Sequence, residues 1–234
     1  MKTALVVFDM AGTTVHDDDA VNICLKQALE SAGIMVSRSE INEVMGEPKP
    51  VAIAKLVSRL RAVQAHTSDR DVIEIHERFK TLMLAHYREA PEVRPAEGAA
   101  DVFRELQASG VRVALDTGFS RVIVDAILKR LGWLGNELVD ATVASDEVLR
   151  GRPHADLIER AMRLTDVSDA KSVAKVGDTP ADLLSGHAAG CGWIVGVTTG
   201  SHTRAQLEPY PHTHLIERLH ELPVALLGAG AVTG

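Results

Sequence analysis

The sequence predicts an α/β fold: a parallel sheet with helices on both faces, interrupted by an inserted all-helical domain. Three observations lead to this prediction. Short apolar runs alternate with helical segments after residue 91, as in parallel sheets that are covered on both sides. A similar apolar run, Ala4 to Phe8, opens the chain. Residues 17–90, which lie between them, show helical periodicity and no strand pattern.

The opening strand leads directly into a small polar turn. Asp9-Met10-Ala11-Gly12-Thr13 follows the apolar run without a break. Open α/β sheets bind ligands at the carboxyl ends of their strands. A carboxylate delivered to that edge is therefore well placed to act as a nucleophile or as a metal ligand.

Residues 17–90 form the predicted cap domain. Ser37 and Glu40 have the spacing of a capping box, in which each side chain bonds the backbone N–H of the other residue. Lys49 lies between two prolines, which indicates a loop. The expected elements are a helix over 20–32 capped by Asp17-Asp18-Asp19, a helix over 37–45, a loop over 46–50, a helix over 51–63 and a helix over 68–88 with Ser68 as its cap.

Residues 1–16 and 91–234 form the predicted core domain, and residues 90–95 are the expected hinge. Alternating strands and helices after the hinge predict a parallel sheet. The segment 211–214, which contains His212 and His214, is expected in a surface turn before the last helix. The other expected elements are strands over 111–115, 139–144, 172–176 and 193–197, and helices over 97–109, 120–131, 154–164 and 181–189.

Composition restricts the functional classes. The 234-residue chain carries a net charge of −7 and has no dense run of Lys or Arg, which argues against nucleic acid as its main partner. Cys24 and Cys191 are far apart in the sequence and are expected to be buried thiols in a reducing compartment. Neither a signal peptide nor a membrane span is indicated, so a cytoplasmic enzyme or binding protein is expected.

Polar residues follow three further strands or loops at the same predicted edge of the sheet. Thr117 follows one strand, Arg152 precedes a helix, and Asp178 and Asp182 follow another strand. Carboxylate oxygens suit Mg²⁺, which takes only a few protein ligands. A cation and a metal would offset the repulsion between a carboxylate nucleophile and an anionic phosphorus group. The sequence therefore predicts a magnesium site for a phosphorus compound.

These residues resemble the four ordered motifs of the haloacid dehalogenase superfamily, and the resemblance spans nearly the whole chain. It implies a Rossmann-like core and a covalent intermediate on Asp9. It also implies that Thr117 and Arg152 contact phosphoryl oxygens. Mg²⁺ would be held by Asp9, the main-chain carbonyl of Ala11 and Asp178, with Asp182 close by or acting through water.

One departure from the common pattern concerns position 11. Phosphatases and mutases of the superfamily usually carry an acid there, which protonates the leaving oxygen, whereas this chain has Ala11. Alanine at this position is similar to the phosphonatase branch, which cleaves a P–C bond through a Schiff base to a cap lysine. Residues 45–49, which include Met45 and end at Lys49, resemble the segment that carries this lysine. Thr117-Gly118-Phe119 is similar to the second phosphonatase motif. Together with Ala11-Gly12-Thr13, Met45, Gly118 and Phe119 are the expected substrate contacts.

A second departure concerns the lysine's neighbour. Phosphonatases carry a histidine three residues after the lysine, where this chain has Ala52. None of the cap histidines, His66, His76 and His86, has the required spacing. Lys49 therefore has three open roles: it forms a Schiff base, it binds an anionic substrate, or it is a solvated surface lysine.

The leading hypothesis is a Mg²⁺-dependent, phosphonatase-like hydrolase that cleaves phosphonoacetaldehyde or a related compound. The alternative is a phosphomonoesterase of the phosphoglycolate phosphatase kind. A non-catalytic protein that binds a phosphorylated metabolite is a third reading, and a mutase is disfavoured by Ala11. The expected partner is a small phosphorylated or phosphonate metabolite, and a homodimer through the cap is possible.

Overall fold

Six parallel strands form one sheet in the computed structural model, which describes residues 2–61 and 69–228. The strand order is β3-β2-β1-β4-β5-β6, so β1 lies in the middle between β2 and β4. The predicted α/β fold with a parallel sheet is confirmed. The strands are β1 Leu5–Asp9, β2 Arg112–Asp116, β3 Ala141–Val143, β4 Val173–Gly177, β5 Trp193–Val197 and β6 His214–Ile216.

Helices cover both faces of the sheet because its strands are apolar on both sides. Val6 and Phe8 of β1 belong to one buried cluster with side chains of α5, α6 and α10. Leu5 and Val7 belong to a second cluster with α7, α8 and α9. These helices are α5 Ala99–Ala108, α6 Arg121–Arg130, α7 Asp156–Leu164, α8 Pro180–Ala188, α9 Arg204–Leu207 and α10 Leu222–Leu227.

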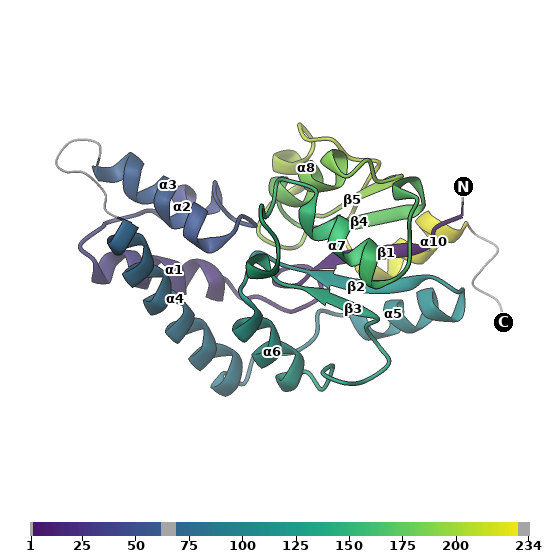
Figure 1. The fold of residues 1–234 in the computed structure, drawn as a ribbon, viewed down its shortest axis with the longest axis horizontal. Coiled ribbons are helices and arrows are strands. Elements are labelled where there is room, and N and C mark those ends of the chain that lie inside the picture. Colours follow the sequence, from purple (N-terminus) through teal and green to yellow (C-terminus); the bar gives the residue numbers. More distant parts are fainter. Residues whose placement is uncertain (1, 62–68, 229–234) are drawn as a thin grey trace.

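Four helices between β1 and β2 form a separate lobe beside the sheet (Figure 1). Among them α4 contacts both α1 and α3, and it also contacts α6 of the core. The two connecting segments run side by side: Val15 bridges Pro95, and the amide of His16 donates to the Arg94 carbonyl at 3.0 Å. The four helices are α1 Ala20–Ser31, α2 Arg38–Asn42, α3 Lys49–Arg61 and α4 Asp69–Glu89.

The predicted caps of α1 and α2 are present, and one of the three acids before α1 makes the capping bonds. Ser37 and Glu40 form the expected capping box of α2. Asp19 is the N-cap residue of α1 but makes no side-chain capping bond. Asp17, two residues earlier, supplies the capping oxygen instead: its Oδ1 accepts from the amides of Ala20 at 2.8 Å and Val21 at 3.4 Å. The expected helix end at Val63, the expected cap Ser68 and the position of His66 lie outside the described residues.

Two expectations from the sequence are wrong. The loop predicted around Lys49 is the first turn of α3, because a proline in a first helical turn lacks only an N–H that has no helical partner anyway. His214, expected in a surface turn, begins β6.

Both cysteines are buried free thiols as predicted. No helix in the described ranges combines the length and apolarity that crossing a bilayer requires.

Candidate active site

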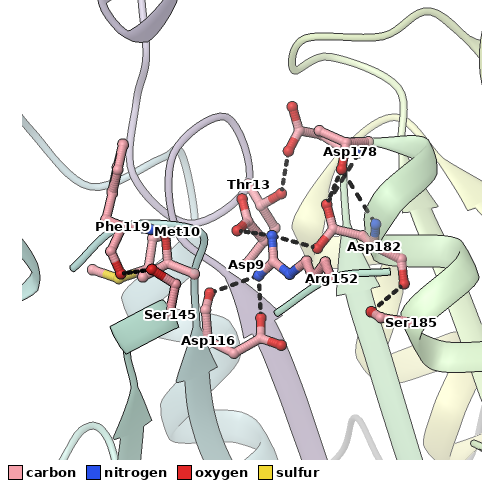
Figure 2. A network of polar contacts seen from close by, with 12 residues as sticks. Asp9, Met10, Thr13, Asp116, Phe119, Ser145, Arg152, Asp178, Asp182 and Ser185 are labelled. Atoms are coloured by element: carbon pink, nitrogen blue, oxygen red, sulfur yellow. Dashed lines mark hydrogen bonds and ion pairs between the residues drawn. The ribbon is translucent and has the colours of Figure 1, made fainter. Parts of the chain in front are cut away.

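The carboxyl ends of the central strands bring the predicted site residues together. Asp9 ends β1 and lies beside Asp116 at the end of β2, while Gly177 at the end of β4 leads into Asp178. Figure 2 shows how closely these side chains approach one another. Asp9, Thr117, Arg152, Asp178 and Asp182 are all buried at this edge. Residues separated by more than 160 positions thus form one polar cluster.

Arg152 lies at the centre of the cluster and is only 2% exposed. Its Nη1 donates to Asp9 Oδ1 at 2.7 Å and lies 2.9 Å from Asp182 Oδ1. Its Nη2 donates to the Asp116 carbonyl at 2.9 Å and also pairs with the Asp116 carboxylate. The planar guanidinium is suited to several carboxylates at once. Arg152 therefore holds the Asp9 carboxylate in a defined orientation.

Two buried charged residues were not predicted from the sequence. Lys175, in the middle of β4, pairs with Asp116 Oδ1 and lies 3.1 Å from Asp182 Oδ1. Both Lys175 and Asp116 have no exposed surface. A charged residue within an otherwise apolar strand is the signal that could have revealed Lys175, because lysines are almost never fully buried unless paired.

The charges and geometry of the cluster fit a divalent cation. Four buried carboxylates, those of Asp9, Asp116, Asp178 and Asp182, face two buried cations, Arg152 and Lys175. If all are ionised, two negative charges remain uncompensated among these described residues, and burial makes such an excess costly. Oxygens of Asp9, Asp178 and Asp182 lie within 4.8 Å of one another. This all-oxygen ligand set suits Mg²⁺.

Asp178 is held in place from both sides. Its Oδ1 accepts from the Thr13 hydroxyl at 3.0 Å, and its Oδ2 accepts from the Ser201 amide at 2.6 Å. A Cβ at Gly12 would lie 2.5 Å from Oδ2, and one at Gly200 would lie 2.2 Å from it. Glycine at both positions therefore leaves the space that this carboxylate occupies.

Without a metal, two of the buried carboxylates, Asp9 and Asp178, retain protons unusually well. Burial raises the pKa of Asp9 to about 8, against the opposing effect of Arg152. Burial, together with the charge of Asp182, raises the pKa of Asp178 to about 6. A bound divalent cation competes with these protons, so metal binding and protonation are linked.

Mg²⁺ affinity is therefore expected to rise with pH. Because Asp9 must lose its proton to bind the metal, the association constant should increase at least about tenfold between about pH 6 and pH 8. Raised pKa values also mean that the metal-free protein loses stability as pH rises through this range, so Mg²⁺ should raise the melting temperature more at the higher pH. Titration calorimetry and thermal melts test this, and a pH-independent affinity would contradict it.

Replacing Lys175 with Met is expected to destabilise the protein. The change leaves Asp116 and Asp182 with less compensation in the buried cluster, and breaking a buried ion pair costs about 3–5 kcal/mol. For a chain of this size the melting temperature should fall by roughly 10 °C. Lys171→Met is the matched control, since Lys171 is exposed. Equal melting temperatures for the two variants would show that the buried lysine contributes nothing.

Lys49 approaches the cluster from the inserted helices. Its side chain is 3% exposed, and Nζ lies 5.9 Å from the ring centre of Phe79 and 5.6 Å from that of Phe119. Burial lowers the pKa of Lys49 to about 8, although the charge of Asp9 opposes this. About a tenth of the amine is therefore neutral and nucleophilic near pH 7, against well under one in a thousand for an ordinary lysine. Phe79 of α4 forms part of the lysine's surroundings.

One small cavity joins Lys49 to the polar cluster. Asp9, Arg152 and Lys49 line it, and its volume is about 30 Å³, room for about one or two water molecules. The other predicted residues at this cavity are Ala11, Met45, Thr117, Gly118 and Phe119. Gly12 and Thr13, also predicted as substrate contacts, instead line a second cavity, as described below.

Close backbone contacts hold the Lys49 segment against the core. A Cβ at Gly118 would lie 2.7 Å from the Glu47 carbonyl, and one at Gly46 would lie 2.3 Å from the Thr179 hydroxyl. Gly46 also has a φ of +84°, which disfavours other residues. The segment before α3 therefore lies directly on the turn after β2. Ala52, which follows Lys49 by three residues, is fully buried.

Comparison with known proteins agrees with this architecture. Residues 6–195 match the haloacid dehalogenase-like hydrolase family. A phosphonoacetaldehyde hydrolase of Latilactobacillus sakei is 28% identical over 239 residues, which cover 97% of this chain and 88% of that protein. One from Bacillus cytotoxicus is 29% identical over 247 residues, covering 99% of this chain and 90% of that one.

Solved structures share the fold at lower identity. A phosphonoacetaldehyde hydrolase-like protein from Oleispira antarctica has a TM-score of 0.85 at 20% identity, covering 97% of this chain and 92% of its own. A predicted phosphoglycolate phosphatase from Haemophilus somnus has a TM-score of 0.78 at 17% identity, covering 95% of this chain and 97% of its own. The family match covers β1 to β4, part of β5 and the whole polar cluster, so the chain belongs to the haloacid dehalogenase-like hydrolases.

Proposed function

We propose that this hydrolase cleaves the P–C bond of a small phosphonate that carries an aldehyde on the carbon next to the P–CH₂ group. The observation that carries the proposal is the placement of Lys49: a buried amine, without an ion pair among the described residues, lines the same cavity as the Asp9 carboxylate. Phosphonoacetaldehyde is the simplest substrate of this class. The named relatives support the same choice.

Lys49 supplies the chemistry that a P–C bond requires. A carbon leaving group is poor unless its electron pair can be delocalised. Condensation of the Lys49 amine with the aldehyde releases water and forms an iminium ion, which accepts that pair. As Asp9 attacks phosphorus, the P–C electrons form a C=C bond and the C=N electrons return to nitrogen, giving an enamine. An acid at position 11 is then unnecessary, which fits Ala11.

Asp9 is the proposed nucleophile, and the surrounding residues are assigned from their positions. Arg152 orients Asp9 and offsets negative charge. Thr117 is buried at the cavity, where its hydroxyl oxygen accepts from the Phe119 amide at 3.2 Å and its hydroxyl proton would be donated to a phosphoryl oxygen. Mg²⁺ would be held by Asp9, the Ala11 carbonyl and Asp178, with Asp182 adjacent. When bound, it supplies positive charge against the phosphoryl oxygens. Water then hydrolyses the acyl phosphate on Asp9.

The inserted helices, residues 17–90, act in this proposal as a cap that brings Lys49 to the core and excludes water. The cavity of about 30 Å³ is too small for a phosphonate, because a volume of that size holds only one or two waters. Substrate entry would therefore require α1–α4 to move away from the core, and closure would place the amine beside the reacting carbon.

A phosphomonoesterase is the second candidate, and one observation favours it. With a pKa of about 8, most Lys49 side chains are still charged at neutral pH, so the ammonium could bind an anionic group of a substrate such as phosphoglycolate. A panel of phosphonoacetaldehyde, phosphoglycolate and other small phosphate esters separates the two. Phosphonoacetaldehyde should show a kcat/KM at least about 100-fold above that of every ester. A preference for an ester would overturn the proposal.

A further inference from the structure

Imine formation at Lys49 creates a proton-transfer problem inside the closed cavity. The ammonium must lose a proton before it attacks, and the carbinolamine oxygen must gain one before it leaves as water. Ala11, which lines the cavity, and Ala52, about one helical turn after Lys49, have no side-chain group that can transfer a proton. Asp9 is committed to phosphorus and metal. Another titratable group must reach the cavity.

Asp17 is such a group. Asp17 lines the cavity that Asp9 and Lys49 line, and it also lines a second cavity of about 460 Å³ beside the two connecting segments. This outer cavity is polar, with His16, Arg94 and Glu217 among its walls. Within residues 2–61 and 69–228, Asp17 is the one residue that lines both cavities. It therefore lies on the boundary between the enclosed amine and the outer space.

The side chain of Asp17 has one oxygen free for this role. Its Oδ1 accepts the amides of Ala20 and Val21 and caps α1. In the described part of the chain no hydrogen bond reaches Oδ2. The cap fixes the carboxyl group in place through one oxygen and leaves the other able to exchange a proton.

We propose that Asp17 is the proton-transfer residue of Lys49: it takes the proton that the ammonium loses and returns it to the carbinolamine oxygen. The inference rests on the proposed imine chemistry. The Asp17 carboxylate takes a proton from the Lys49 ammonium, and the neutral amine attacks the aldehyde carbon. After a proton moves from nitrogen to the new alkoxide, protonated Asp17 gives its proton to the carbinolamine hydroxyl. The hydroxyl leaves as water, and the nitrogen lone pair completes the iminium.

The electrostatic environment of Asp17 supports proton exchange with Lys49. Burial raises the pKa of Asp17, and the Ala20 and Val21 amides oppose the rise. Its charge is among those that raise the pKa of Lys49. The proton affinities of carboxyl and amine are thus brought closer together than in water. The other titratable groups that act on Asp17, or on which it acts, are Asp19 and Cys24 beside it and His86 and Tyr87 of α4.

The competing explanation is that Asp17 only caps α1. Asp17→Asn separates the two roles, because asparagine caps a helix as well as aspartate does but cannot transfer a proton. Asp18→Asn is the matched control: Asp18 is adjacent in the sequence and lines the outer cavity but not the inner one. Asp17→Ser, which also retains a capping oxygen, provides a second variant in case the first folds poorly.

The test measures single-turnover imine formation, read as borohydride-trapped Lys49, together with steady-state hydrolysis of phosphonoacetaldehyde. Asp17→Asn should slow trapping and kcat about 100-fold, with little change in KM or melting temperature. Asp18→Asn should remain within about twofold of the unmodified protein. Formate, a small acid that fits the outer cavity, should restore part of the rate to Asp17→Asn and add nothing to the parent enzyme.

The outcomes separate this inference from the proposed function. If the parent enzyme traps at Lys49 and Asp17→Asn and Asp17→Ser trap equally fast, the proton-transfer role of Asp17 is wrong and the imine chemistry stands. If a folded variant loses activity only to the extent that its melting temperature falls, and formate does not restore the rate, Asp17 acts only as a helix cap. If an active parent enzyme never traps at Lys49, both proposals fail.

Discussion

Asp9→Asn should abolish turnover, with kcat lowered by roughly 10⁴-fold or more, because an amide cannot form the acyl phosphate. The substitution preserves shape, and the new amide oxygen can still accept from Arg152, which now donates to Asp9 at 2.7 Å. The Asp9→Asn variant should therefore still fold. Steady-state kinetics with saturating Mg²⁺ measure the loss.

The stability of this variant provides an internal check. Since burial raises the pKa of Asp9, its ionised form is costly in the metal-free protein, and an amide removes that cost. Metal-free Asp9→Asn should thus melt at the same temperature as the parent or higher at alkaline pH. Asp101→Asn, at a highly exposed position of α5, is the control and should retain full activity.

The same variant decides whether the protein is an enzyme or only a binding protein. An inactive Asp9→Asn that still binds phosphonoacetaldehyde, seen by calorimetry, assigns Asp9 to chemistry. A parent protein that binds the compound without turnover, and an Asp9→Asn that binds it equally, would instead indicate a non-catalytic role. Substantial residual turnover in Asp9→Asn would contradict its assignment as the nucleophile.

Lys49→Arg should lower kcat on phosphonoacetaldehyde by roughly 10³-fold or more. Arginine keeps the positive charge but its guanidinium is not a nucleophile at accessible pH, so no imine forms. If Lys49 merely binds an anionic substrate, the arginine variant should keep most of its activity. Steady-state assays on phosphonoacetaldehyde and phosphoglycolate measure both cases.

Lys55→Arg is the control for this change. Lys55 lies on the same helix as Lys49 but is largely exposed, and its Nζ pairs with Glu47 at 2.7 Å. Arginine retains that pair, so activity should remain within about twofold. Loss of activity in both variants would indicate a disturbed helix, and retention in both would exclude imine formation at Lys49.

The edge of the sheet could be predicted because each element there has a local signal. Asp9 and Asp178 follow apolar runs that form buried strands, and parallel strands align their carboxyl ends. The capping box of Ser37 and Glu40 is likewise a local pattern, and it is present. Features that depend on a few neighbouring residues were therefore accessible from the sequence.

Features that depend on contacts between distant elements were not. Asp116 of β2 and Lys175 of β4 compensate each other's charge across the intervening strand β1. No local sequence pattern indicates that these two residues form a pair. Phe79 reaches Lys49 only because α4 packs against α3. The strand β6 has three residues, too few for alternation to be recognised. The start of α3 was missed because Pro50 indicates a loop unless the helix begins just before it.

Trapping the imine tests the central claim most directly. The enzyme is incubated with phosphonoacetaldehyde and Mg²⁺, reduced with borohydride, digested and examined by mass spectrometry. The account predicts irreversible loss of activity that requires both substrate and borohydride, with N-ethyl-lysine at Lys49 and none at Lys55, because the enamine left by P–C cleavage takes up a proton to form an ethyl iminium. Full activity after reduction, with Lys49 unmodified in an enzyme that turns over phosphonoacetaldehyde, would contradict it.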